Sequence, residues 1–147
     1  MCLQSIPRQQ IDGLLFQVLK RVYLWEREID SIFGLTYQDI YFLQHLRKAS
    51  PCCITDIASE LCIPLFQATR LVARLEKCGF IAKEKKAKDR RTVWVSLLPA
   101  GEDVLLSIEE RSYELILNNS AELPIEEVQS FLKAAEKIDQ ILKVPHE

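Results

Sequence analysis

Residues 54–97 read ITDIASELCIPLFQATRLVARLEKCGFIAKEKKAKDRRTVWVSL, and this stretch decides the fold. Apolar residues spaced three and four apart predict a short helix over 55–61 and a longer helix over 65–78. The Cys62–Pro64 segment separates them as a turn, and the Thr55 hydroxyl is expected to cap the first helix. Residues expected on the buried stripe of the second helix are Ala68, Leu71, Val72 and Leu75.

A β-hairpin is predicted directly after the second helix. Gly79 suits the positive φ with which many helices end, and alternating residues predict strands over 80–85 and 92–97. The charged segment 86–91 joins them as a tip. Helix, turn, helix and hairpin in this order are typical of a winged helix-turn-helix, a DNA-reading module. The predicted fold class is therefore mainly α (α+β), with a two-stranded β wing.

Positive charge is concentrated in the same stretch. Residues 65–98 contain nine cations and three anions, a net charge of +6, in a chain whose net charge is −2. Residues 99–147 contain four cations and eleven anions, a net charge of −7. A local basic surface within an acidic chain favours a polyanionic partner such as nucleic acid.

Three short segments carry a resemblance to a known family. They are TRLVARLEKCGFI at 69–81, DRRTV at 89–93 and LLPAG at 97–101. In this register the chain resembles the MarR (multiple antibiotic resistance regulator) family of dimeric winged-helix repressors, over nearly its whole length. The resemblance implies a homodimer that binds a pseudo-palindromic operator in double-stranded DNA. It also implies release by a small aromatic or apolar effector.

Long helices are predicted on both sides of the decisive stretch. Apolar residues repeat at helical spacing over 7–33 and 99–143, and the final helix is expected over 125–143. We expect one domain over residues 1–147, in which 35–98 form a winged-helix lobe that binds DNA. A two-fold dimer reads two half-sites, so the long flanking helices are assigned to dimerisation, as the resemblance also implies. For the first of them, packing within the chain is an equal alternative.

The 65–78 helix is expected to lie in the major groove with its N-terminal half facing the base edges. Gln67 suits adenine and Arg70 suits guanine, whereas Thr69 suits a phosphate or a thymine methyl group. Leu65 and Phe66 have two interpretations, packing beneath the preceding helix or contact with thymine methyl groups. Residues assigned to the phosphate backbone are Thr55, Arg74 and Lys77.

The wing tip is expected to enter or straddle the minor groove. Arg90 and Arg91 suit its negative potential, which is strongest where A·T tracts narrow the groove. Lys86 and Lys88 are expected to add salt-dependent affinity without sequence preference. The resemblance further implies that Asp89 orients the Arg91 side chain. A solvated hairpin tip without DNA contact is the alternative.

The resemblance implies an effector cavity between the dimerisation helices and the winged-helix lobe. Aromatic residues assigned to ligand binding are Tyr23, Trp25, Tyr37 and Tyr41. Aromatic side chains at helical spacing also fit a hydrophobic core, and this alternative stays open. A ligand would act by favouring one separation of the two lobes over another.

Other classes of function receive less support. The sequence has no glycine-rich phosphate loop, no nucleophile paired with a base and no metal-ligand cluster. We therefore predict no enzyme, no catalytic residue, no cofactor and no metal site. Without an export signal or an apolar run of about 18 residues, we expect a cytoplasmic chain with no membrane segment.

Five cysteines without an export signal favour reduced thiols over a disulfide framework. A thiol-based redox sensor on the same fold is one alternative function. Within the resembled family such sensing uses a cysteine near the first helix, and Cys2 is the cysteine nearest to it. A winged helix that serves for protein contacts is a second alternative, which the basic wing disfavours.

Overall fold

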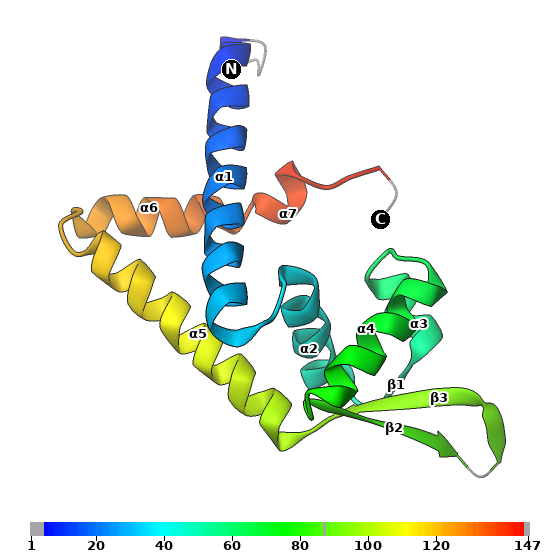
Figure 1. Cartoon of the computed structure of the whole chain (residues 1–147). Coiled ribbons are helices and arrows are strands. Elements are labelled where there is room, and N and C mark those ends of the chain that lie inside the picture. The colour runs from blue at the N-terminus through cyan, green and yellow to red at the C-terminus, as the bar shows by residue number, and fades with distance from the viewer. Residues whose placement is uncertain (1–4, 87, 146–147) are drawn as a thin grey trace. The chain divides into compact units, whose positions relative to one another are not determined.

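The structure is a computed structural model that describes residues 5–86 and 88–145, without the side chains of Asp89 and Arg90. Its elements fall into two units, residues 1–108 and 109–147. The first contains α1 (Arg8–Phe33), α2 (Tyr37–Ala49), β1 (Cys52–Cys53), α3 (Ile54–Glu60), α4 (Leu65–Lys77), β2 (Ile81–Lys86), β3 (Asp89–Leu97) and the start of α5 (Pro99–Ser120). The second contains the rest of α5, α6 (Ile125–Ala135) and α7 (Ile138–Ile141) (Figure 1).

The wing belongs to a three-stranded antiparallel sheet in the order β1-β3-β2. β2 and β3 form a hairpin as predicted, with Lys83 opposite Val95 and a register shift between Lys85 and Lys86. β3 begins at Asp89, three residues earlier than predicted, so Arg91 lies on the strand and not in the tip. Cys52 of β1 pairs with Val95 from the other side of β3. The winged helix with its two-stranded wing is thus confirmed, and β1 adds a short third strand at the base of the hairpin (Figure 1).

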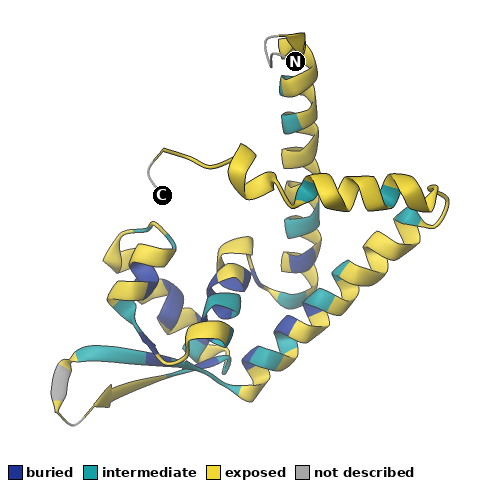
Figure 2. Cartoon of the chain, turned by 180° about the vertical axis from the view of Figure 1, so that it is seen from behind, coloured by how far each residue is buried: buried dark blue, intermediate teal, exposed yellow. Residues whose placement is uncertain are grey.

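A closed hydrophobic core holds the winged-helix lobe (residues 35–98) together. The residues predicted for the buried stripe of α4 are all buried, namely Ala68, Leu71, Val72 and Leu75. They belong to one core with Phe42 and Leu46 of α2 and Ile57 of α3, which are fully covered. Figure 2 shows buried stretches of the lobe in dark blue on its helices. The core therefore fixes which face α4 turns outward.

One buried carboxylate joins the start of α2 to the end of α4. Asp39 is fully covered and accepts hydrogen bonds from the Thr36 backbone N–H at 2.8 Å and the Thr36 hydroxyl at 2.9 Å. The Asp39 N–H donates to the same hydroxyl, which makes a capping box. Arg74 forms an ion pair with the second carboxylate oxygen. These donors compensate the cost of burying a charge.

Residues with positive φ shape the ends of α3 and α4. Gly79 follows α4 with φ of 78°, as predicted. Cys62 follows α3 with φ of 52°, a conformation that costs a residue with a Cβ about 1 kcal/mol or more. The predicted Thr55 cap is wrong. β1 runs directly into α3, so Cys53 is the N-cap residue and Thr55 lies inside the first turn.

α5 begins in close contact with the base of the wing. The Leu98 N–H donates to the Phe80 carbonyl at 2.9 Å. A Cβ at position 101 would overlap the Phe80 carbonyl oxygen and the Leu97 side chain. Gly101 is therefore required by the close approach of two backbone segments, and it sets where α5 leaves the lobe.

α1 carries more apolar surface than the chain covers. Its C-terminal turns pack against the core through Trp25, Ile29 and Phe33, so packing within the chain holds for this part of the helix. Large apolar side chains that stay exposed on α1 are Ile11, Leu14, Phe16, Val18, Leu19, Val22, Tyr23, Leu24 and Ile32. Among the described residues, no helix is both long enough and apolar enough to cross a membrane.

The second unit differs from the lobe in its burial. None of residues 109–145 is buried (Figure 2). The single helix predicted over 125–143 is wrong, because α6 and α7 are separate. The Lys137 N–H donates to the Ala134 carbonyl, three residues back, which replaces the α-helical bond at the break. Exposed apolar residues in this unit include Tyr113, Ile116, Leu117, Ile125, Phe131, Leu132, Ile138, Ile141 and Leu142.

Candidate nucleic-acid interface

The face of α4 that turns away from the core is exposed along the helix. It contains the residues predicted to contact DNA, namely Leu65, Phe66, Gln67, Thr69, Arg70, Arg74 and Lys77. Leu65 and Phe66 are 52% and 60% exposed. Neither is buried beneath α3, so packing there does not account for them. Ala73, with its small side chain, lies in the middle of this face and allows a partner surface to approach closely.

Two contacts order the N-terminal half of this face. The Arg70 guanidinium lies 5.9 Å from the centroid of the Phe66 ring, one helical turn away. This cation–π contact does not occupy the N–H donors of the guanidinium, which stay available to a partner. The Thr69 hydroxyl donates to the Leu65 carbonyl at 2.9 Å, so its oxygen keeps its acceptor capacity.

Arg74 and Lys77, both predicted to contact phosphates, have different surroundings. The Arg74 side chain is 46% exposed and paired with the buried Asp39. Lys77 is exposed in the last turn of α4. The structure therefore gives Arg74 a role within the fold that sequence reasoning missed, and the phosphate contacts of both residues stay predictions.

A cavity of about 220 Å³ lies between the start of α4 and the wing. Its walls come from α3, α4, β3 and the residue before α3, and its lining residues are Cys53, Ile54, Thr55, Leu65, Thr69, Arg91, Thr92 and Val93. The Cys53 sulfur and the Thr55 hydroxyl lie 3.1 Å apart in this wall. The fold thus brings Thr55, Thr69 and Arg91, three predicted DNA contacts from separate elements, around one hollow.

Two lysines of the wing make contacts with neighbouring side chains. The Lys86 ammonium lies 3.9 Å from the centroid of the Trp94 ring, a cation–π contact. Lys83 forms an ion pair with Glu76 of α4 at 2.9 Å, which ties β2 to that helix. Lys88 and Arg91 are exposed. The predicted roles of Asp89 and Arg90 concern side chains that lie outside the described part of the structure.

Two of the aromatic residues assigned to an effector form a pair on α2. The rings of Tyr37 and Tyr41 stack with centroids 6.4 Å apart and planes 7° apart. The Tyr41 hydroxyl donates to Glu60 of α3 at 2.8 Å, and this hydrogen bond, with partial burial, raises the pKa of Tyr41. His45 Nδ1 lies 3.7 Å from the same Glu60 oxygen. These contacts tie α2 to α3 and leave Tyr37 53% exposed.

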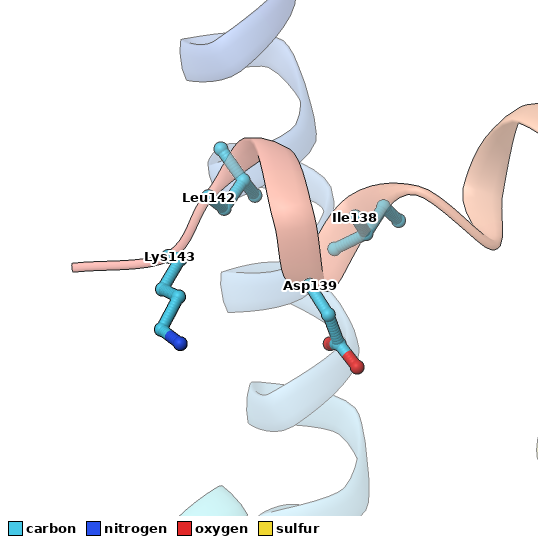
Figure 3. Close-up of a pocket in the computed structure, with 4 residues that line it drawn as sticks. All are labelled: Ile138, Asp139, Leu142 and Lys143. Carbon is cyan, nitrogen blue, oxygen red and sulfur yellow. The ribbon is translucent and has the colours of Figure 1, made fainter. Parts of the chain in front are cut away.

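The other two aromatic residues lie on α1 in different surroundings. Trp25 packs against the core, as the core alternative expects, whereas Tyr23 is 57% exposed. Neither lines the cavity beside the wing. A second hollow, of about 390 Å³, lies in the other unit, and its lining residues are Ile138, Asp139, Leu142 and Lys143 (Figure 3). All four come from α7 and the residues just after it, so this hollow does not include the predicted effector residues.

The cysteines differ in accessibility. Cys52 is buried, and desolvation raises the pKa of its thiol to about 11, so this thiol is protonated and unreactive near neutral pH. Cys62 and Cys78 carry free, exposed thiols. Cys2, the cysteine considered for redox sensing, lies outside the described residues.

Comparisons with known proteins identify the family. Residues 35–93 match the sequence profile of the MarR family. The uncharacterized HTH-type transcriptional regulator YwhA of Bacillus subtilis is 30% identical over 114 residues, which cover 78% of each chain. The chain belongs to the MarR family. The HTH-type transcriptional regulator BilQ of Clostridioides difficile is 23% identical over 106 residues, 72% of each chain.

Solved structures agree with this assignment at the level of the fold. A MarR family protein from Bacillus stearothermophilus superimposes with a TM-score of 0.80 at 20% identity, over 95% of this chain and all of the other. The YusO protein of Bacillus subtilis gives a TM-score of 0.76 at 21% identity, over 90% and 94% of the two chains. The predicted resemblance is confirmed, and membership of the MarR family makes this chain a winged-helix transcriptional regulator.

Proposed function

We propose that this MarR-family chain is a homodimeric repressor that binds a pseudo-palindromic operator in double-stranded DNA and is released by a small aromatic or apolar effector. In each protomer α4 enters the major groove and the wing enters the adjacent minor groove. One observation carries the proposal. The exposed face of α4, backed by a closed core, combines donors and acceptors suited to base edges with apolar residues suited to methyl groups.

Electrostatics support a DNA partner. Residues 65–98 carry a net charge of +6, and they form α4 and the wing. Cations at both elements neutralise phosphates on either side of a groove, which gives affinity that falls with salt. Arg91 on β3 and Thr69 on α4 line one cavity, so a backbone that passes between wing and helix contacts both residues.

The distribution of apolar surface supports a homodimer. α1, α6 and α7 leave large apolar side chains exposed, among them Phe16 at 66%, Phe131 at 71% and Ile141 at 73%. Soluble monomers rarely expose large contiguous apolar patches, whereas obligate homodimer interfaces resemble a hydrophobic core cut in half. A second copy of the chain is the partner that covers such helices and also supplies a second α4 for the other half-site.

The Tyr37–Tyr41 pair supports an aromatic or apolar effector. Its parallel rings, 53% and 38% exposed, offer a flat surface on which a planar ligand can stack. The pair lies on α2, whose other face belongs to the core of the lobe. A ligand that prefers one separation of the two lobes shifts the dimer away from the spacing that the operator requires. The relatives named above are transcriptional regulators, and we assign no catalytic residue.

The first test is selection of binding sites from a random pool of duplex DNA at fixed salt. We expect the wild-type protein to enrich an inverted repeat with half-sites about 10 base pairs apart. Arg91→Ala is expected to bind the selected site about tenfold more weakly. Lys133→Ala, which removes an exposed cation from α6, is the matched control and keeps wild-type affinity. Failure of the wild-type protein to enrich any site at low salt contradicts the proposal.

The second test concerns assembly. Phe131→Asp places a charge in the exposed apolar surface of α6 and is expected to convert the dimer to a monomer in sedimentation equilibrium. Ser59→Asp adds the same charge at an exposed position of the lobe and leaves the dimer intact. A wild-type protein that sediments as a monomer at every concentration rules out the dimer.

A further inference from the structure

The first turn of α4 presents an aromatic ring to solvent. Phe66 is 60% exposed and does not line the cavity beside the wing, whereas its neighbour Leu65 does. The two apolar residues therefore have different surroundings. Phe66 shares its side of α4 with Arg70, whose guanidinium lies over the Phe66 ring. The aromatic ring and the cation form one small surface in the N-terminal half of α4. This surface lies on the side of the helix that faces away from the core.

This contact restrains Arg70 in the free protein. A long arginine side chain loses rotamer freedom when it binds, and a platform that already holds it lowers this cost. The guanidinium carbon lies 5.9 Å from the ring centroid, and a cation–π contact leaves the guanidinium N–H groups available as a bidentate donor. Phe66 therefore has two properties, an exposed apolar surface of its own and a support for its neighbour.

The major groove of DNA offers a matching pair of groups. Among the four bases thymine alone presents a methyl group there, and guanine presents the O6 and N7 acceptors that suit a bidentate guanidinium. Residues four apart on a helix are separated by about 6 Å along its axis. Stacked bases of one strand are about 3.4 Å apart. Phe66 and Arg70 therefore match groups that lie one or two base pairs apart.

We propose, on the basis of the DNA-binding function argued above, that Phe66 and Arg70 act as one reading unit. The unit selects a thymine and a guanine within two base pairs of each other in each half-site. The Phe66 ring covers the C5-methyl group of the thymine, and Arg70 donates to O6 and N7 of the guanine. Loss of the ring weakens both contacts, because Arg70 then loses its support.

The test uses the operator selected by the wild-type protein, with single atoms changed in one half-site. Deoxyuridine in place of thymine removes one methyl group and keeps base pairing. At one thymine the wild-type protein is expected to lose about fourfold in affinity, as expected for one methyl-sized group. Phe66→Ala is expected to bind the thymine and uracil sites equally. Gln67→Ala, a change in the same helical turn, is expected to weaken binding to both sites and to keep the fourfold difference between them.

A second set of sites separates the two roles of the ring. Replacing the guanine with 7-deazaguanine removes N7, and the wild-type protein is expected to lose about tenfold in affinity. Arg70→Ala abolishes this sensitivity. Phe66→Leu keeps an apolar side chain without an aromatic face, so it is expected to retain the methyl effect and to lose most of the 7-deazaguanine effect.

The outcomes distinguish this inference from the function on which it rests. If no site is selected, the DNA-binding proposal itself fails. If a site is selected but wild-type and Phe66→Ala proteins lose the same affinity on removal of every methyl group, the reading unit alone is overturned. A methyl effect that disappears in Leu65→Ala and persists in Phe66→Ala also overturns it. Thermal unfolding of the variants checks that truncation of these exposed side chains leaves the fold intact.

Discussion

The winged-helix lobe and residues 109–147 differ in how far they bury their apolar side chains. In the lobe, Phe42, Leu43 and Leu46 are completely covered by other residues of the same chain. In the second unit Phe131 is 71% exposed and Ile141 is 73% exposed. Both regions are rich in helix and in large apolar residues, so composition does not separate them. The lobe contains its own core, whereas the second unit leaves its apolar residues exposed.

Under the proposed homodimer, the stability of the two regions has separate origins. Burial within one chain stabilises the lobe at any protein concentration. Apolar surface that is covered by a second chain contributes to stability only in the fraction of protomers that are assembled. This contribution therefore depends on protomer concentration. Substitutions in the two regions should therefore differ in their dependence on concentration.

The largest expected effect is a core truncation. Phe42→Ala removes a fully covered ring and should lower the free energy of unfolding by about 3–5 kcal/mol, measured by urea denaturation. The effect should not change with protein concentration. Phe131→Ala is the matched truncation in the second unit and should cost less than about 0.5 kcal/mol in dilute solution, with a larger effect as concentration rises. Equal and concentration-independent losses would remove the distinction between the regions.

A smaller effect is expected where a buried charge holds two helices of the lobe. Asp39→Ala leaves the Thr36 donors and Arg74 without their acceptor and should destabilise the lobe by about 3 kcal/mol. Glu76→Ala removes the half-buried partner of Lys83 and should cost less than about 1 kcal/mol. Thermal unfolding of both variants measures the difference. Similar losses would show that the Asp39 pair gains nothing from its burial.

A third prediction concerns the buried thiol of the lobe. The pKa of Cys52 is raised to about 11 in the folded chain, above its ordinary value of 9.0, so the unfolded chain loses this proton first as pH rises. Stability from this group is complete below pH 9 and declines up to about pH 11, by at most about 1.4 kcal/mol per pH unit. The fall between pH 8 and pH 10 should shrink in Cys52→Ala. It should persist in Cys62→Ala, whose thiol is exposed.

The smallest expected effect is a gain in stability at the turn between α3 and α4. Cys62 has φ of 52°, which glycine adopts without the penalty of a Cβ. Cys62→Gly should therefore raise the free energy of unfolding by about 0.5–1 kcal/mol, measured by urea denaturation. Cys78→Gly changes an exposed cysteine with an ordinary negative φ and should not stabilise the chain. A loss in Cys62→Gly would mean that the thiol makes a contact worth more than the relief of strain.

Sequence periodicity predicted the lobe well because its helices and wing are defined by local patterns. The prediction of a helix over 65–78 rests on the apolar stripe Ala68, Leu71, Val72 and Leu75. The observed α4 ends one residue earlier, at Lys77. β1 was not predicted, because a strand of two residues has no period and forms only by pairing with β3 far along the chain. The Thr55 cap failed for the same reason, since β1 makes Cys53 the residue that enters α3.

Long-range polar contacts were beyond sequence reasoning. Thr36 and Asp39 have the spacing of a capping box, but nothing in the sequence connects Asp39 with Arg74, which lies 35 residues further on. Charge alone therefore suggested a phosphate contact for Arg74. The segment between α6 and α7 contains neither proline nor glycine, and apolar residues keep their helical spacing across it. The sequence therefore predicted one continuous helix. The exposure of Phe66 also required the structure, because an apolar residue at the first turn fits a core equally well.

The contact between Lys86 and Trp94 gives the wing an optical signal of its own. The chain has two tryptophans, and Trp25 packs against the core while Trp94 lies in the wing beneath an ammonium group. A phosphate that draws Lys86 away from the ring changes the field around the indole and shifts its emission. Under the proposed function, a Trp25→Phe protein reports the arrival of the wing on a nucleic acid by fluorescence, without a label and in real time.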